Sequence, residues 1–377
     1  MSKVAFFADH IAEWQAGTEG QMLMLAKGLV EKGWTVPLFI FRDSGAAQDG
    51  RWPGSVTDLD ITSMASPSNW LKAIRVARSL RAAGYRLAHL YFSDTSILLP
   101  PFFRMLGIKI IVSRRDMGFW YTPVRLFLLR INRFFTNYVV ANCNAVRDVA
   151  RECEKYQEKK IAVIFNGFEK TDSTKGQGRR RLRRADHQST YTVGILANLR
   201  PIKRIDDVIR AIALLQQSAG ELEINLLVAG ADRPGRCGPS HKLELENIAA
   251  ELGISDKITF FGSTSDARSF LDRCDIGVLV SETEGLSNTV IEYLAHGLPA
   301  VVSRAGGNDE IVLDNVNGYV VKVGDIQGLS DRMRELLKDK EKRLRFGQQG
   351  IDRVAEKFSA DKMFGRYEMI YQELLAE

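Results

Sequence analysis

Short apolar runs alternate with amphipathic stretches through the first half of the chain. Residues 3–8 (KVAFFA) and 34–41 (WTVPLFIF) are apolar and rich in residue types that favour strands. Between them, EGQMLMLAKGLVEKG places apolar residues at helical spacing and ends at Gly33, which is typical of a helix C-cap. This pattern predicts a strand–helix–strand unit. Four more predicted strands follow, at 87–92, 108–113, 138–143 and 161–166.

A polar segment interrupts this alternation. Between Phe168 and Thr190 the chain carries two glycines and the run RRRLRR, with almost nothing to bury. We therefore predict a basic linker at 171–190. Beyond it the alternation resumes with five predicted strands, at 191–198, 224–230, 258–262, 276–281 and 299–303.

Strands that alternate with helices favour a parallel sheet covered by helices on both faces. A chain of 377 residues also exceeds the size at which one hydrophobic core keeps growing. The sequence therefore predicts an α/β protein with two facing, doubly wound, Rossmann-like domains. The predicted parts are a first domain at 1–170, a second at 191–354, and a C-terminal helix at 355–377 that packs back toward the first domain.

Composition narrows the function classes. Hydrophobic residues make up 45% of the chain and charged residues 26%, which is ordinary for a globular protein. No stretch reaches the roughly 20 uncharged apolar residues that a membrane-spanning helix needs, and the N-terminus lacks the basic region of a signal peptide. We expect a cytoplasmic protein. The four cysteines show no metal-ligand spacing and predict reduced thiols.

The formal net charge of +6 is unevenly placed, with clusters at 114–133 and 179–184. Basic clusters of this kind suit phosphates, nucleic acid or anionic lipid, or form a solvated face. The run RRRLRR at 179–184 has no interleaved aromatic residues and belongs to no recognisable nucleic-acid-binding module, and it fits an inter-domain linker better. We therefore predict no nucleic-acid partner.

The segment after the predicted strand 276–281 carries the clearest chemistry. A helix is predicted to begin at Ser287-Asn288-Thr289 and to stop at Gly297. A helix start offers unpaired N–H groups and a positive dipole end, which suit a diphosphate. Glu284 precedes this start and Glu292 follows it, so the two acids bracket the expected phosphate. Taken alone, Glu292 would be more typical of an exposed surface residue and Glu284 of a helix-entry turn.

The whole stretch EGLSNTVIEYLAHGLPAVVS resembles the E-x7-E signature of the family-four retaining glycosyltransferases, which have the GT-B fold. Several further segments are similar to that family. They are AGTEGQMLMLAKGLVEKGWTV, YVVANCNAVRDVA, IAVIFNGFE, GILANLRPIKRIDDVIRAIALL, FFGSTSDARSFLDRCDIGVLVSETEG and AGGNDEIVLDNVNGYVV. The resemblance therefore extends over most of the chain, more strongly in the second half.

The resemblance implies a site for a nucleoside-diphosphate sugar, with UDP favoured over GDP. Glu284 would hold the sugar hydroxyls, Lys203 and Arg200 would supply counter-charge to the diphosphate, and these three are the predicted catalytic residues. Glu292 would bind the ribose. The other implied donor-binding residues are Gly17, Asn198, Thr264, Asp266, Gly285, Leu286, Ser287, Asn288 and Thr289.

Two positions depart from the family pattern. Asn198 stands where the family usually has an arginine, and Arg200 is expected to substitute for it. Arg115 stands where the family commonly has a histidine, so Arg115 and Asp116 are predicted only as acceptor-side residues.

The predicted reaction is sugar transfer with retention at the anomeric carbon, without a metal and without a cofactor beyond the nucleotide-sugar substrate. A metal-dependent transferase would hold its ion with a clustered Asp-x-Asp at a strand end. The residues DLD at 58–60 match this pattern, but they lie in a polar, proline-bearing region without a following helix pattern, and we predict no metal site. The departing diphosphate would be stabilised by fixed charges and the helix start.

The acceptor is less defined by the sequence. We expect a polysaccharide or lipid-linked glycan, as in the synthesis of a cell-surface polymer or glycolipid. Residues 119–135 (FWYTPVRLFLLRINRFF) combine bulky apolar residues with three arginines on one side of a predicted helix. This helix has two interpretations, an apolar stripe in the core or a contact with the anionic inner face of the cytoplasmic membrane.

Two other functions fit the same architecture. A nucleotide-sugar epimerase would use the donor site without an acceptor, and would interconvert sugar nucleotides without releasing the nucleoside diphosphate. A non-catalytic sugar-nucleotide binder is the other alternative, because Asn198 and Arg115 depart from the family pattern.

Overall fold

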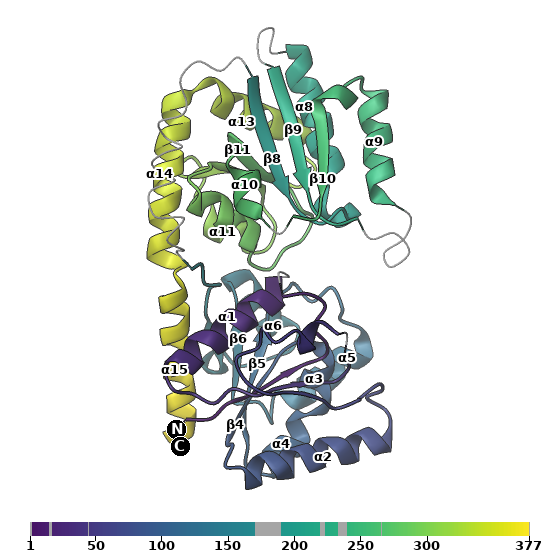
Figure 1. Ribbon diagram of the computed structural model, residues 1–377, viewed down its shortest axis with the longest axis vertical. Helices are drawn as coiled ribbons and strands as arrows, with labels where there is room; N and C mark the ends of the chain where they lie inside the picture. The colour runs from purple at the N-terminus through teal and green to yellow at the C-terminus, as the bar shows by residue number, and fades with distance from the viewer. Residues whose placement is uncertain are drawn as a thin grey trace. The chain divides into compact units, whose positions relative to one another are not determined.

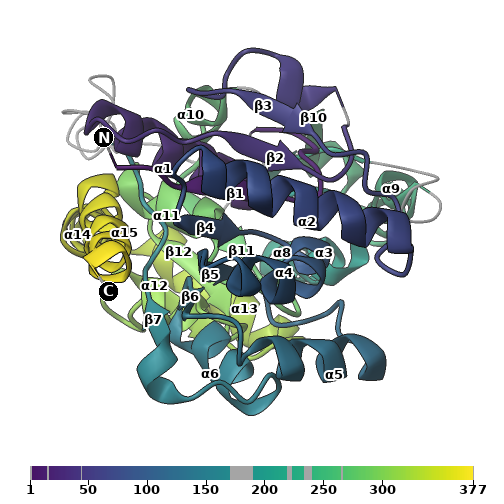
Figure 2. The same ribbon diagram turned by 90° about the horizontal axis from the view of Figure 1, so that it is seen from below.

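The computed structural model describes residues 2–14, 17–43, 45–169, 190–218, 223–232, 240–264 and 266–376. The chain forms two compact units, each with a parallel sheet that has helices on both faces (Figure 1, Figure 2). Residues 1–167 and 360–377 make the first unit, and residues 168–359 make the second. The predicted linker at 171–190 lies outside the described residues except for Thr190.

The first unit is built on a seven-stranded parallel sheet of order β3-β2-β1-β4-β5-β6-β7. Its interior strand β1 is buried on both faces, as its unbroken apolar run predicts. The strands are β1 (Ala5–Ala8), β2 (Leu38–Ile40), β3 (Val56–Asp58), β4 (Leu87–Leu90), β5 (Lys109–Arg114), β6 (Tyr138–Ala141) and β7 (Ile161–Val163).

Successive side chains of β1 point into different cores. Phe6 packs with residues of α1 and α15, whereas Phe7 packs with residues of α2, α3 and α4. Gly28 of α1 lets α15 approach closely, because an added Cβ would lie 2.6 Å from the Phe364 ring. The helices of this unit are α1 (Gly17–Glu31), α2 (Pro67–Ala82), α3 (Ser93–Leu98), α4 (Pro100–Met105), α5 (Pro123–Asn132), α6 (Asn144–Glu152) and α15 (Ala360–Ala376).

A buried histidine fastens α15 to the first sheet. His89 of β4 shares hydrogen bonds with the Tyr371 hydroxyl at 2.6 Å and the Ser113 hydroxyl at 2.8 Å. Burial and the charge of Arg115 keep the pKa of His89 well below its usual value, so the ring is neutral. The last helix of the chain therefore belongs to the first unit, although it follows the second unit in sequence.

The second unit has a six-stranded parallel sheet of order β10-β9-β8-β11-β12-β13. Its strands are β8 (Thr190–Leu196), β9 (Glu223–Ala229), β10 (Ile258–Gly262), β11 (Ile276–Leu279), β12 (Ala300–Ser303) and β13 (Gly318–Val321). Its helices are α8 (Ile205–Ser218), α9 (His241–Glu251), α10 (Ala267–Leu271), α11 (Asn288–Ala295), α12 (Asn308–Ile311), α13 (Ile326–Lys338) and α14 (Lys340–Lys357).

The predicted fold class, two doubly wound parallel α/β domains, is confirmed. Sequence reasoning missed two short edge strands, β3 and β13. In the part of the chain that the structure describes, no helix is long and apolar enough to cross a membrane. In open sheets of this type, ligands bind beyond the carboxyl ends of the strands, which is where the predicted site residues of each unit must be sought.

Candidate active site

The strongest cluster of predicted residues lies beyond the carboxyl ends of β8 and β11 in the second unit. Lys203 ends a short 3₁₀ turn, Pro201–Lys203, in the loop after β8. Its Nζ donates a hydrogen bond to Glu284 Oε1 at 2.6 Å, forming an ion pair. The Ser281 hydroxyl donates to the same oxygen at 2.6 Å. The Glu282 N–H also donates to the Ile202 carbonyl at 2.9 Å, so backbone and side chains both join the two loops.

A third loop, after β12, packs against the backbone of the segment that carries Glu284. Gly306 has φ +55°, and an added Cβ there would lie 1.7 Å from the Glu284 carbonyl oxygen. The Gly307 N–H donates to the Gly285 carbonyl at 2.7 Å. Only glycine fits this close approach, so Gly306 fixes the backbone that carries Glu284. The sequence-based prediction missed this residue, although two adjacent glycines in the loop after the predicted strand 299–303 were a usable signal.

The helix start predicted between the two acids is present as α11. Ser287 is its N-cap, and its hydroxyl accepts a hydrogen bond from the Val290 N–H at 3.4 Å. Thr289 and Tyr293 tie the helix to β8, since the Thr289 hydroxyl donates to the Leu196 carbonyl and the Tyr293 hydroxyl accepts from the Leu196 N–H. Leu286 and Ser287 are buried, whereas Gly285, Asn288 and Thr289 are half-buried.

Glu292 lies on the second turn of α11, and the surroundings of its carboxyl group are unusual for a charged residue. Its side chain is half-buried, and no described residue forms a hydrogen bond or an ion pair with its carboxyl group. Burial raises the pKa of Glu292 to about 7. An ionised carboxylate here lacks the hydrogen-bond donors that would stabilise it, and a ligand that brings hydroxyl groups would supply them.

Four other predicted donor residues of this unit have simpler surroundings. Arg200 and Asn198 are exposed, and the Asn198 Oδ1 accepts from the Ala231 N–H at 3.0 Å. Asp266 caps α10 by accepting from the Ser269 N–H at 3.0 Å, and its own N–H donates to the Thr264 hydroxyl at 3.2 Å. These hydrogen bonds shape the two loops, and a role of the four residues in ligand binding stays a prediction.

The remaining predicted residues, Gly17, Arg115 and Asp116, belong to the first unit. Gly17 begins α1. Arg115 and Asp116 directly follow β5, and the Arg115 Nη2 donates to Asn166 Oδ1 at 2.6 Å. Asp116 accepts from the Gly118 N–H at 2.7 Å and from the Trp120 indole N–H at 3.0 Å. Burial raises the pKa of the Asp116 carboxyl above its usual value.

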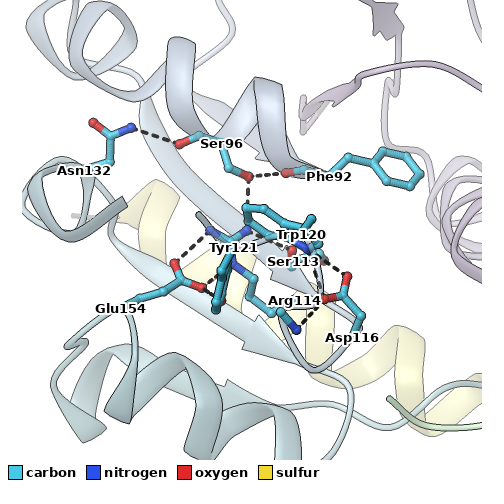
Figure 3. Close-up of polar contacts among 10 residues, drawn as sticks. Phe92, Ser96, Ser113, Arg114, Asp116, Trp120, Tyr121, Asn132 and Glu154 are labelled. Atoms are coloured by element: carbon cyan, nitrogen blue, oxygen red, sulfur yellow. Dashed lines mark hydrogen bonds and ion pairs between the residues drawn. The ribbon is translucent and has the colours of Figure 1, made fainter. Parts of the chain in front are cut away.

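Arg115 and Asp116 line a hollow of about 290 Å³, part of it open to solvent, at the carboxyl ends of β4 and β5. Arg114, another residue of its lining, forms a buried, two-point ion pair with Glu154 at 2.6 and 2.9 Å (Figure 3). The Tyr121 hydroxyl also donates to Glu154. The other lining residues are Thr18, Tyr91, Phe92, Ser113 and Trp120.

Phe92, which lines this hollow, has a strained backbone conformation. Its φ is 67° and its ψ is −172°, a backbone region that residues other than glycine rarely adopt. In the first turn of α3, which follows Phe92, the N–H groups of Asp94 and Thr95 donate hydrogen bonds to the Asp9 carboxylate at 2.9 and 2.8 Å. Strain of this kind clusters at functional sites, so the geometry agrees with a ligand site in the first unit.

The described residues hold no group of three or more His, Cys, Asp or Glu side chains placed to bind a metal ion. That the reaction needs no metal ion stays a prediction from the sequence, because a metal ion can also be held through the phosphates of a substrate.

Comparison with known proteins identifies the family. Residues 16–171 match the model described as Glycosyltransferase Family 4, and residues 181–353 match Glycosyl transferases group 1. N-acetyl-alpha-D-glucosaminyl L-malate synthase of Bacillus anthracis is 31% identical over 182 residues, 48% of this chain and 45% of that protein. D-inositol 3-phosphate glycosyltransferase of Stackebrandtia nassauensis is 25% identical over 287 residues, 74% of this chain and 59% of that protein. The matches thus span about half the length of these curated relatives.

Solved structures agree in fold. Anabaena Alr3699/HepE in complex with UDP superposes with a TM-score of 0.82 at 18% identity, covering 99% of this chain and 100% of that chain. A glycosyltransferase from Rickettsia africae gives a TM-score of 0.80 at 17% identity, covering 99% and 98% of the two chains. The two matched family models together cover most of the chain, and the chain belongs to the group 1, family 4 glycosyltransferases of GT-B fold.

Proposed function

We propose that this protein transfers a sugar from UDP-sugar to a hydroxyl group of a polysaccharide or lipid-linked glycan, with retention at the anomeric carbon and without a metal ion. The observation that carries the proposal is the arrangement around α11. A carboxylate held by a lysine precedes the helix start, and a half-buried carboxyl without a described partner follows it. Two acids on either side of a helix N-terminus suit the two polar ends of a nucleoside-diphosphate sugar.

Each group has a distinct role in this proposal. The diphosphate lies at the N-terminus of α11, where the N–H groups of Asn288 and Thr289 face it, and Lys203 and Arg200 balance its charge. Glu292 accepts hydrogen bonds from the ribose hydroxyls, which gives its ionised form the donors it lacks in the free protein. Glu284 binds hydroxyl groups of the transferred sugar. UDP is favoured because the Anabaena relative of this fold is described in complex with UDP.

Retention is proposed from the family resemblance, and the way Glu284 is held bears on which retaining mechanism operates. A double displacement needs a free carboxylate nucleophile beside the anomeric carbon. Glu284 Oε1 already accepts hydrogen bonds from Lys203 and Ser281, which makes it a weak nucleophile and a good hydroxyl ligand. We therefore favour attack on the same face. The acceptor oxygen bonds to the anomeric carbon, the bond from that carbon to the phosphate oxygen breaks, and this oxygen takes the acceptor proton.

The hollow beside Arg115 and Asp116 is the proposed acceptor region of the first unit. It presents a guanidinium, a carboxyl group and an aromatic side chain, Trp120, which together suit the hydroxyl groups and apolar faces of a sugar. A glycan acceptor agrees with this lining. We place the reaction in the synthesis of a cell-surface polysaccharide or glycolipid.

The test is incubation of the full chain in EDTA with UDP-sugars and GDP-sugars, with and without oligosaccharide acceptors. Proton NMR follows release of the nucleoside diphosphate and the anomeric configuration of the product. Release of UDP with a product of unchanged configuration supports the proposal. Inversion contradicts the mechanism. Interconverted sugar nucleotide without released UDP would instead identify an epimerase, and binding without any turnover would identify a non-catalytic sugar-nucleotide binder.

A further inference from the structure

Helix α5 presents an apolar face to solvent. Residues of this face recur at helical spacing, and Phe119 in the preceding turn adds to it. We call this set the α5 surface: Phe119, Val124, Phe127, Ile131 and Phe134, which are 75%, 68%, 62%, 40% and 69% exposed. Of the two interpretations of segment 119–135, a stripe in the core is wrong for these five side chains.

The opposite face of α5 holds the helix in the first unit. Leu129 and Asn132 are buried, and the Asn132 amide donates to the carbonyls of Ser96 and Ile97 in α3 at 3.0 and 2.7 Å. Figure 3 shows Asn132 reaching Ser96. The orientation of the helix is therefore set by a buried polar contact, and the exposure of the α5 surface is not the result of a loosely packed helix.

Cations collect beside the C-terminal half of α5. The Arg130 Nε donates to the Cys153 carbonyl at 2.8 Å, and the Arg133 guanidinium lies over the Phe134 ring at 4.7 Å. Lys160 reaches the Arg133 and Thr136 carbonyls. Burial lowers the pKa of Lys160, and the positive charges of Arg104 and Lys159 lower it further. The Arg133 Nη1 also donates to the Lys155 carbonyl at 2.7 Å. The cationic residues that these interactions place around this end of the helix are Arg104, Arg130, Arg133, Lys155, Lys159 and Lys160.

The acids of the described residues do not pair with these cations. No ion pair joins any of the six to an acid in the part of the chain that the structure describes, whereas Glu152 and Glu158 nearby are paired with Arg147 and Arg151. At the other end of the helix, Arg125 pairs with Asp94 at 3.6 Å. The result is an apolar row with an excess of positive charge at one end.

We propose that the α5 surface docks on an anionic lipid bilayer, with its apolar row in the headgroup region and the adjacent cations against lipid phosphates. A row of exposed phenylalanines beside unpaired arginines and lysines matches the two components of such binding, apolar burial and electrostatic attraction. The excess of positive charge beside the apolar row favours an anionic surface over a second copy of this chain, which carries the same charge. The proposal does not depend on the donor site, because it concerns only the first unit.

The test is co-sedimentation of the full chain with vesicles of phosphatidylglycerol and phosphatidylcholine in equal parts, or of phosphatidylcholine alone, without nucleotide. We expect pelleting with the anionic vesicles that weakens at high salt. The variant Phe127→Ser/Phe134→Ser should lower the partition coefficient about tenfold or more. The variant Arg130→Gln/Lys159→Gln should lower it at low salt and change it little at high salt.

Helix α2 of the same unit provides matched controls. It carries two exposed apolar residues, Trp70 and Leu71, and two exposed cations, Arg75 and Arg78. Trp70→Ser/Leu71→Ser and Arg75→Gln/Arg78→Gln should leave vesicle binding unchanged. All altered side chains are exposed, so the variants should keep the thermal stability of the parent, which a melting curve verifies.

Three results would overturn the proposal. The first is no pelleting with anionic vesicles at low salt, and the second is an equal loss of binding in the α2 variants. The third is a dimer in light scattering that Phe127→Ser/Phe134→Ser dissociates, since a second copy would then cover the α5 surface. Binding to vesicles by a chain that fails to bind UDP would still support the membrane proposal, so the two proposals fail separately.

Discussion

Lys203 and Glu284 lie 81 residues apart in the sequence and form an ion pair of 2.6 Å at the carboxyl edge of the second sheet. The pair joins the loop after β8 to the loop before α11, and the Ser281 hydroxyl completes it. Both side chains are mostly shielded from solvent, at 22% and 13% exposure, so the pair holds the two loops in register before any ligand arrives. This preorganisation underlies the first two predictions.

Replacement of the lysine should affect catalysis far more than folding. We predict that Lys203→Met lowers kcat by about 10² to 10³, because one fixed positive group is lost from the leaving diphosphate. The measurement is the rate of UDP release from the best donor. Lys257→Met is the matched control, since Lys257 forms a 3.1 Å ion pair with Glu223 on the surface of the same unit. An equal loss of activity in the control would contradict the role of Lys203.

A methyl group at Gly306 should displace the segment that carries Glu284. We predict that Gly306→Ala is destabilised by more than about 2 kcal/mol and binds UDP more weakly, because its Cβ would overlap the Glu284 carbonyl and its φ is positive. Urea unfolding and calorimetry measure the two effects. Gly253→Ala is the control for backbone strain alone. Gly253 also has a positive φ, +68°, but an added Cβ there would have no atom within 4 Å. Equal behaviour of the two variants would refute the overlap argument.

Glu292 should make both stability and ligand affinity depend on pH. Its pKa is about 7 in the folded protein against 4.5 for an unperturbed glutamate. The folded state thus binds the proton more tightly, so this contribution to stability is full below about pH 4.5 and is lost as the pH rises through about 7. The loss should be on the order of 3 kcal/mol. The measurement is the free energy of unfolding from urea titrations across this range.

Glu292→Gln is the control for this titration, because the amide resembles the protonated acid at every pH. The stability of the parent relative to Glu292→Gln should fall between about pH 4.5 and 8. UDP affinity relative to the variant should rise over the same range, since ribose hydroxyls favour the ionised carboxylate. A pH-independent difference in both measurements would exclude this carboxyl as the titrating group.

The buried ion pair of the first unit should be essential for stability. We predict that Glu154→Gln costs about 3 to 5 kcal/mol, because it leaves Arg114 charged and unpaired in the interior. Thermal or urea unfolding of the full chain measures this cost. Glu152→Gln removes an exposed partner of Arg151 and should change stability by less than about 1 kcal/mol. Comparable losses in the two variants would show that burial does not determine the strength of the pair.

The alternation of apolar runs was sufficient to predict the fold class, because buried parallel strands leave an unambiguous apolar signal. The strands that escaped prediction are short edge strands. In β3, Val56 is half-buried and Thr57 and Asp58 are exposed, so no apolar run marks it. The family resemblance was equally visible in the sequence, since its motifs lie at strand ends, and it is confirmed.

Side-chain pairings could not be predicted in the same way. The Lys203–Glu284 and His89–Tyr371 contacts join residues 81 and 282 positions apart, and they depend on sheet order and register. The strain at Phe92 and the close approach at Gly306 are backbone properties that residue types alone do not reveal. Exposure of the α5 surface was also undecided in the sequence, because an apolar stripe at helical spacing fits a core helix equally well.

The most direct test of the central claim is thermal stabilisation by UDP in EDTA, compared between the parent chain, Glu292→Gln and Lys257→Met. UDP at about 100 times its dissociation constant should stabilise the parent by about 2.7 kcal/mol, with a clear rise in Tm. Lys257→Met should respond like the parent, and Glu292→Gln should respond less at a pH above about 7. No stabilisation of a folded parent chain by UDP would contradict a UDP-sugar site at α11, and GDP alone as the stabilising nucleotide would contradict the choice of base.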